Sequence, residues 1–462
     1  MEDVCYDGVF ERMLGLSKGR MEVYLSHVCH RWREVATSTA VLWTDIDAPK
    51  TPGGQGAARA EAYLLRSKAR LVDVSMVVTV DDYSGPRTNW GQGFLQVAAK
   101  HSTRWRSLVL QFPAAYTSDR DWDAAVLCNI LRDVAVPQLE RLELTIDSGS
   151  SAEEYIDHQI FLQGTPRLSD LLLRANQSFW FILPMDSITT LTIYAYYAEF
   201  PIKRILSLPG LQHLNITRHK TPNFIPIELE EEDSVLERDS PSRLISLRLS
   251  LCDLPAICSL SATFRPALEN VTHLFLFDPT NSGDAESCTW REGSDDEDEE
   301  GWDDWSSQLE GLEPQELAVF PSLEHLSVDF GLKHSSYFLE NDTTLCRLTN
   351  NIKTLSILHG RLELDAENGS LEALWPRLEK LYLASISDEL EKRDILVDWI
   401  TKRGRQSDGT FTVEFGPKAV EKLKKGENLH NKVSGMKKAV RMEPVSKYGK
   451  IFDGWPPRSQ DS

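Results

Sequence analysis

Residues 139–144 read LERLEL, and the spacing of their apolar residues decides the fold. With Φ for an aliphatic or aromatic residue, the stretch has the form Φ-x-x-Φ-x-Φ. Ten spaced occurrences of this pattern start at Trp105, Leu139, Leu168, Ile188, Leu211, Leu244, Val271, Leu323, Ile352 and Leu378. Successive starts lie 34, 29, 20, 23, 33, 27, 52, 29 and 26 residues apart. This self-similarity predicts a stacked repeat, because one such unit cannot bury its own apolar edges.

The alternation within the motif predicts a β-strand with one buried side. Side chains alternate between the two faces of a strand, so the fourth and sixth residues point into the core and the fifth and seventh point outward. Leu142 and Leu144 are then core residues, whereas Glu143 and Thr145 lie at the surface. Stacked units would form a parallel sheet on the concave side, with helices or coil on the convex side.

A proline stands two residues before several of the units. These sites are PQL at 137–139, PRL at 166–168, PGL at 209–211, PSL at 321–323 and PRL at 376–378. Proline has no backbone N–H and resists helix continuation, so it ends the convex segment just before the strand. An ordinary parallel α/β sheet is the alternative, but its strands usually read as continuous apolar runs.

In this spacing the chain resembles the leucine-rich repeat family, in the degenerate form found in many intracellular ligase adaptors. The Asn or Cys that often follows the strand in that family is mostly missing, although Cys252 keeps a similar position. The resemblance implies an α/β fold, a leucine-rich-repeat solenoid shaped as a horseshoe with a parallel concave sheet.

A helical pattern precedes the repeats. Residues 25–46 read LSHVCHRWREVATSTAVLWTDI. Apolar residues follow helical spacing at Leu25, Val28, Cys29, Trp32, Val35 and Ala36. The Thr-Ser-Thr at 37–39 then ends this helix before a short turn that holds Leu42 and Trp43. A stripe of this kind by itself indicates a packed core as readily as an interface.

The same string resembles the second half of an F-box, a small all-α module that docks onto the Skp-type adaptor of a cullin ubiquitin ligase. The resemblance covers residues 1–50, although the family's Leu-Pro helix start is replaced by MEDVCYDGVFERMLGLSKGRM. Residues 60–78, AEAYLLRSKARLVDVSMVV, resemble the helix and strand that follow the F-box in many fungal members. The resemblance implies adaptor contacts for Leu25, Val28, Cys29, Trp32, Leu42 and Trp43.

These patterns divide the chain into an F-box-like module at 1–50, a connecting helix and strand at 51–104, a solenoid at 105–415 and a basic, disordered tail at 416–462. An acidic insertion is expected near 284–311, because residues 292–304 carry nine acidic side chains and no basic one. The tail has eleven Lys or Arg against five Asp or Glu. Both charged segments are typical of solvated chain.

Composition limits the partners. A net charge of −20 disfavours nucleic acid, and no apolar run reaches the roughly 20 residues that span a bilayer. The acidic N-terminus lacks the features of a signal peptide, and seven scattered cysteines fit reduced thiols, so we expect an intracellular protein, cytoplasmic and/or nuclear.

Motifs that would indicate an enzyme do not occur in the sequence. G-x-S-x-G, G-x-x-x-x-G-K-[ST], H-E-x-x-H and the EF-hand loop are all missing. His27, Cys29 and His30 lack a fourth ligand at zinc-type spacing, and acidic neighbours would blunt the reactivity of Cys288. We therefore expect a non-enzymatic protein without a metal or cofactor.

The outward strand positions are the candidate target-binding residues. They are Arg174, Tyr194, Tyr196, Arg248, Phe275, Phe277 and Tyr382. Exposed aromatic and arginine side chains contribute most of the energy at protein interfaces, although loops can also fold over such a face. Alanine at Tyr194 and Phe275 should weaken target binding without loss of stability. A loss of stability would assign them to the core.

Two functions fit these features. In the first, the chain is the substrate-recognition subunit of a cullin ligase: the F-box helices bind the Skp-type adaptor and the repeats bind an unknown target protein. In the second, the repeats are a scaffold or chaperone-like binder that holds a basic protein through the acidic run, without a role in ubiquitin ligation. A nuclear address or nucleic-acid contact in the tail is a weaker idea, because Lys424-Lys425 and Lys437-Lys438 are separate pairs.

Overall fold

The computed structural model divides the chain into two compact units, residues 1–189 (unit 1) and 190–462 (unit 2). The structure describes residues 21–48, 55–77, 90–112, 129–146, 160–175, 185–195, 202–218, 243–250, 253–258, 265–277, 320–329, 349–359, 375–386, 390–407, 410–423 and 441–444. The acidic run at 292–304 lies outside these residues.

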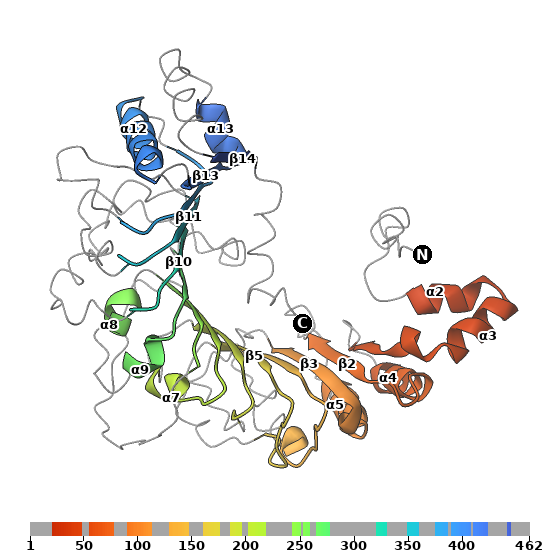
Figure 1. Cartoon of the computed structure of the whole chain (residues 1–462). Helices are drawn as coiled ribbons and strands as arrows, with labels where there is room; N and C mark the ends of the chain where they lie inside the picture. The colour runs from red at the N-terminus through yellow and green to blue at the C-terminus, as the bar shows by residue number, and fades with distance from the viewer. Residues whose placement is uncertain are drawn as a thin grey trace, which may run out of the picture. The chain divides into compact units, whose positions relative to one another are not determined.

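Unit 1 begins with short helices and continues as strands joined by helices. The helical part comprises α2 (Met21–Val28), α3 (His30–Ser38) and the 3₁₀ turn η1 (Ala40–Trp43). There follow β1 (Asp45–Asp47), α4 (Gln55–Arg66), β2 (Val72–Val77), α5 (Trp90–Ala99), η3 (Ser102–Arg104), β3 (Trp105–Phe112), β4 (Arg141–Ile146) and β5 (Asp170–Ala175). Helices α4 and α5 pack side by side next to the first strands (Figure 1).

The described part of unit 2 contains both strands and helices. The strands are β6 (Thr190–Ala195), β7 (His213–Arg218), β8 (Ser246–Ser250), β9 (His273–Phe277), β10 (His325–Asp329), β11 (Thr354–His359), β12 (Lys380–Leu383), β13 (Thr412–Phe415) and β14 (Arg441–Pro444). The helices are α7 (Ile202–Leu206), α8 (Leu254–Cys258), α9 (Arg265–Leu268), α12 (Leu390–Gln406) and α13 (Pro417–Leu423).

All strand pairs described within each unit are parallel and join strands that are consecutive in the sequence. In unit 1 the order is β1-β2-β3-β4-β5. In unit 2 it runs from β6 to β14. A doubly wound sheet reverses its strand order at a switch point, whereas here every crossover advances in one direction. The chain is therefore a mixed α/β protein whose open parallel sheet has a solenoid-like arrangement.

The ten sequence motifs coincide with β3 to β12, and their register explains the core. Leu108 pairs with Leu142, and Leu142 pairs with Leu171, so the fourth motif positions form one row across the strands. In unit 2 the same row runs through Leu247, Leu274 and Leu326. These leucines are buried, which confirms the expected inward positions. Each strand buries its apolar side against its neighbours' equivalent residues.

A β-turn precedes most of the motif strands. Its first carbonyl accepts a hydrogen bond from the first motif residue, as in Leu139 N to Val136 O (3.2 Å) and Leu378 N to Trp375 O (3.0 Å). Proline holds the second turn position in five repeats, where its fixed φ suits a type I turn. The next residue donates to the preceding repeat, as in Glu140 N to Arg106 O (2.8 Å). The turn therefore ends the segment that precedes each strand and also fixes the register of the strand.

The sheet extends past both limits that the sequence suggested for the solenoid. Strands β1 and β2 precede residue 105, and α13 and β14 lie in the segment that was expected to be disordered. β1 and β14 lack the full Φ-x-x-Φ-x-Φ spacing, so periodicity alone does not detect them. β2 has this spacing at Leu71, Val74 and Met76, and it coincides with the strand expected in the connecting segment. Gly416, directly after β13, packs closely against the neighbouring strand segment. A Cβ atom at this position would lie 2.9 Å from the backbone of Ala384.

Helices in the described part of the chain are all too short or too polar to cross a bilayer.

Candidate functional site

The helical segment at the start of unit 1 is two helices rather than the single helix expected from its spacing. Helix α2 ends at Val28 and α3 begins at His30. Between them Cys29 is extended, with φ −161° and ψ 173°, and its carbonyl accepts the first bond of α3 from Arg33 N (2.9 Å). The prediction of one helix with a continuous apolar stripe from Leu25 to Ala36 is therefore wrong, because the break rotates α3 relative to α2.

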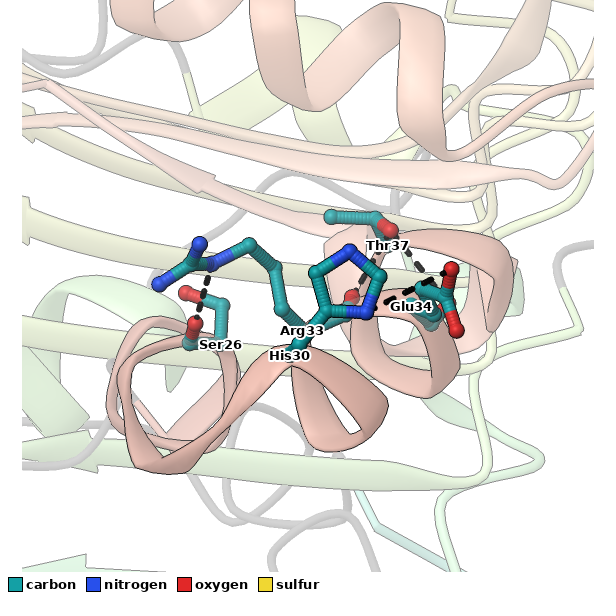
Figure 2. A network of polar contacts seen from close by, with 5 residues as sticks. All are labelled: Ser26, His30, Arg33, Glu34 and Thr37. Carbon is teal, nitrogen blue, oxygen red and sulfur yellow. Dashed lines mark hydrogen bonds and ion pairs between the residues drawn. The ribbon is translucent and has the colours of Figure 1, made fainter.

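Polar contacts hold the two helices together across this break (Figure 2). The Arg33 Nε donates to the carbonyl of Ser26 on α2 at 2.8 Å. Within α3, His30 Nδ1 lies 3.6 Å from Glu34, and the Thr37 hydroxyl donates to the carbonyl of Arg33 at 2.8 Å. Because His30 and Glu34 are exposed, their contact adds little stability. Of these contacts, the bond from Arg33 to Ser26 is the one that joins the two helices.

Large apolar side chains remain exposed on this helix pair. Val28 is 63% exposed, and Trp32 and Val35 on α3 are each 50% exposed. Trp32 and Val35 are three residues apart and therefore lie on the same face of α3. Tyr24 on α2 and Val41 in η1 are exposed as well. We call these five residues the helical surface. Exposed apolar residues that gather on a small module are typical of docking sites.

The predicted adaptor contacts fall into two groups. Val28, Cys29 and Trp32 are exposed, and Leu25 and Leu42 are half-buried. Trp43, by contrast, is only 1% exposed, so its assignment as a contact residue is corrected. Its indole Nε1 donates to the carbonyl of Ala36 at 2.7 Å, which turns the ring into the protein.

Trp43 joins the helical module to helix α4. Its ring meets Tyr63 of α4 edge to face at 4.9 Å, and the Arg66 guanidinium lies 4.3 Å from its centre. The Tyr63 hydroxyl in turn donates to the buried Glu22 carboxylate of α2. Burial, and secondly this bond, raise the pKa of Tyr63 to about 12. The two helices are thus anchored on α4, while Trp32 stays outside.

The second candidate surface is the outward side of the sheet in unit 2, formed by the third, fifth and seventh motif residues of β6 to β12 and by the residues of β13 that pair with them. We call it the outward face. Phe275 and Phe277 are each 4% exposed and Tyr382 is buried, so the expectation that they are exposed is corrected. Tyr194 and Arg248 are half-buried, as is Arg174 in unit 1, and Tyr196 lies outside the described residues. The alternative prediction, in which other parts of the chain cover this face, therefore applies to Phe275, Phe277 and Tyr382.

Arg248 lies among the aromatic residues of this face. Its guanidinium is 4.7 Å from the centre of Phe275 and 5.1 Å from that of Phe277. Burial lowers the pKa of Arg248, while the charges of Tyr194 and Asp329 oppose that effect. Each cation–π contact contributes about 0.5–2 kcal/mol, more when the cation is desolvated. The two rings therefore offset part of the cost of withdrawing this cation from water.

A row of histidines occupies the third motif position, which sequence reasoning missed. His213, His273 and His325 start β7, β9 and β10. The rings of His273 and His325 stack, with centres 4.4 Å apart and planes at 20°. His213 Nδ1 lies 2.6 Å from the Ser246 hydroxyl on β8. The signal was present as LQHL, VTHL and LEHL, because the third residue of the motif shares its side of the strand with the fifth.

The histidine row predicts acid sensitivity. Burial, then the charges of His325 and His213, lower the pKa of His273 to about 4, against about 6.5 in an unfolded chain. The folded state therefore binds fewer protons than the unfolded state between these values. The contribution of His273 to the free energy of unfolding is therefore fully present above pH 6.5. It decreases by about 3 kcal/mol as the pH drops to 4.

The measurement for this prediction is urea unfolding at pH 7.5, 5.5 and 4.5. The His273→Gln variant should lose stability less steeply with falling pH than the unchanged protein. The exposed His27→Gln variant should keep the original slope. Equal slopes for all three proteins would refute the role of His273.

Two charged residues meet at the other end of the outward face. Lys380 Nζ lies 2.7 Å from Glu414 Oε1, and Glu414 is 2% exposed. Burial, and then the Glu414 charge, raise the pKa of the neighbouring Tyr382. Strands β12 and β13 therefore carry an ion pair between a half-buried lysine and a buried glutamate, whereas β8 and β9 carry an arginine beside two aromatic rings.

The described residues contain no group of three or more His, Cys, Asp or Glu that could hold a metal ion. Of the described cysteines, Cys258 is buried and Cys29 is exposed. Comparison with protein-family models finds no match to this chain, and comparison with curated proteins finds no similar sequence.

Proposed function

We propose that this protein is the substrate-recognition subunit of a cullin-type ubiquitin ligase, intracellular and without catalytic activity of its own. In this function the F-box-like helices bind a Skp-type adaptor, and a leucine-rich-repeat solenoid binds the target protein. The observation that carries the proposal is the exposed Trp32, on a short helical module directly before a stack of parallel strands.

The helical surface has the composition of a docking site. Trp32, Val28 and Val35 expose half or more of their side chains, and tryptophan is the residue type most enriched at interface hot spots. Trp43 and Glu22 hold the same module to α4, so the surface belongs to a module that is packed on the rest of unit 1. The resemblance of residues 25–46 to an F-box supplies the identity of the partner, as an argument from analogy.

The outward face supports a role in target binding. Its repeated motif places polar and aromatic side chains in parallel rows, and Tyr194 and Arg248 remain part-exposed there. Because each repeat contributes a few side chains to one continuous face, such a stack can recognise an extended surface of another protein. The cullin ligase and the target both stay proposed partners.

The decisive experiment is co-purification with a Skp-type adaptor. Trp32→Ala should lower the affinity for the adaptor by about thirtyfold or more, the usual effect of removing a hot-spot residue. Leu65→Ala is the matched control, because Leu65 is an exposed apolar residue on α4 outside the helical surface. It should bind the adaptor as the unchanged protein does.

The outcomes separate the two candidate functions. Adaptor binding that is lost with Trp32→Ala and retained with Leu65→Ala supports the ligase subunit. Without any adaptor binding at moderate salt, the ligase proposal fails. Binding of a basic protein that weakens steeply with salt, and disappears on deletion of 292–304, would then favour the scaffold, whose nine acidic residues supply the attraction.

A further inference from the structure

Helix α3 buries little of its own surface. Of its nine residues only Ala36 is buried, whereas Trp32 and Val35, on one side of the helix, are each 50% exposed. Helices this short are marginal by themselves in water, and most helices in proteins are stabilised by the packing of an apolar side. A partner that covers Trp32 and Val35 would therefore stabilise α3 as well as bind to it.

Two exposed cations lie beside this apolar side. Arg31 and Val35 are four residues apart, so Arg31 lies on the same side of α3 as Val35. Lys68 follows helix α4, and its Nζ donates a hydrogen bond of 3.2 Å to the carbonyl of Ser38, at the C-terminal end of α3. Ser38 is three residues beyond Val35 and belongs to the same side. Arg31 and Lys68 are both exposed, and we call them the basic edge of the helical surface.

The backbone around Lys68 directs its side chain toward α3. Its φ of 55° lies in the left-handed region, in the turn after a helix, where glycine is the usual residue. The Arg104 guanidinium donates to the carbonyl of Lys68, and also to that of Arg70 at 3.1 Å. The turn is therefore held from within unit 1 while the Lys68 side chain stays at the surface.

Acidic side chains of the helical module lie away from this side of α3. Glu34 is two residues from Trp32 and therefore does not share its side, and it lies 3.6 Å from His30 (Figure 2). Glu22 is buried and accepts the hydrogen bond of Tyr63. The charge beside the apolar side is thus positive, although the whole chain carries −20. Because interfaces pair opposite charges, this surface complements an apolar groove that is bordered by carboxylates.

Partners that carry rows of phosphates match the same surface less well. Anionic membranes and nucleic acids are bound through clusters of several cations, and the charge of −20 would repel such polyanions from the rest of the chain. Here the basic edge lies beside apolar side chains that include Val28, 63% exposed, and Trp32. A protein groove can bury these apolar side chains and place single carboxylates next to Arg31 and Lys68.

We propose that the basic edge binds carboxylates at the border of an apolar groove on the Skp-type adaptor, and that this groove receives Trp32. This inference rests on the proposed function and adds to it the chemistry of the adaptor's side of the contact. The two parts of the surface affect different rates. Burial of Trp32 slows dissociation, whereas charges at the rim of an interface speed association.

The test measures the two rates separately, with the full-length chain and immobilised adaptor at about 50 mM and about 500 mM salt, which span strong and weak charge interactions. Arg31→Glu should lower the association rate constant about fivefold or more at low salt, and high salt should remove most of the difference. Lys68→Gln keeps a donor for the Ser38 carbonyl but loses the charge, and it should slow association about twofold. Trp32→Ala should mainly raise the dissociation rate.

Arg132→Glu is the matched control. Arg132 is an exposed arginine of unit 1 outside the helical surface, and its replacement changes the net charge by the same amount. Arg31→Lys keeps the positive charge and should keep the association rate. Equal slowing by Arg132→Glu and Arg31→Glu would reveal an effect of net charge alone and would overturn the basic edge. Thermal unfolding shows that each variant is folded before its rates are compared.

The outcomes distinguish this inference from the proposed function. If the adaptor binds through Trp32 but Arg31→Glu leaves the association rate unchanged, the basic edge is refuted and the proposed function stands. If the adaptor does not bind, both fail. Vesicles of phosphatidylcholine and phosphatidylserine, single-stranded RNA and a second copy of the chain are tested as other occupants. Binding of any of these that is lost with both Trp32→Ala and Arg31→Glu would overturn the assignment to the adaptor.

Discussion

The Trp43→Ala variant is expected to lose about 3–5 kcal/mol of unfolding free energy, the range for removing a large aromatic residue from a core. Trp43 is 1% exposed, and the substitution removes its edge-to-face contact with Tyr63, its place beneath Arg66 and its hydrogen bond to Ala36. Urea unfolding measures the total loss. Hydrogen exchange across 55–66 should rise as well, because α4 loses the side chain that packs against it.

Trp32→Ala is the control for this variant, since it removes the same side chain from the same module at a 50% exposed position. It should change stability by less than about 1 kcal/mol, as most surface substitutions do. The pair therefore separates folding from binding: one tryptophan stabilises the module, and the other is available to a partner. Equal destabilisation by both variants would place Trp32 in the core and remove the basis of the helical surface.

The Phe275→Ala variant should also lose stability, by about 3–5 kcal/mol, in contrast to what the strand pattern alone predicts. Phe275 is 4% exposed, and its ring lies against Arg248 and near Phe277, with ring centres 6.4 Å apart. Without this ring a cavity remains and the guanidinium loses one of its two aromatic contacts. Urea unfolding of the full-length protein measures the loss of stability. Hydrogen exchange at residues 273–277 shows whether the loss occurs at β9.

Tyr194→Ala is the matched variant on the same face. Tyr194 is only half-buried, so its loss should cost about 1 kcal/mol, near the average for point substitutions. If Phe275→Ala left stability unchanged, the ring would be accessible in solution. The expectation of an exposed aromatic target-binding residue would then be restored.

The sequence by itself was sufficient to predict strands β3 to β12. Ten motifs predicted β3 to β12, and their fourth positions, such as Leu142 and Leu274, are buried as expected. The reason is local, because a strand's side chains alternate and a repeated pattern aligns equivalent residues in a parallel stack. The proline turns are local too, since a turn is closed by one hydrogen bond over four residues. The short strands β1 and β14 lack this pattern and became visible only through their pairing.

Which side chains face solvent was decided by the tertiary structure. In sequence, Trp32 and Trp43 belong to the same helical module and were given the same role, yet α4 covers one of them and leaves the other exposed. Phe275 alternates as a surface residue should, but it is buried on the outward face. Periodicity determines the side of an element on which a residue lies, whereas burial depends on what distant segments place against that side. The sequence therefore established the repeat, and only the fold distinguished its core from its candidate binding surfaces.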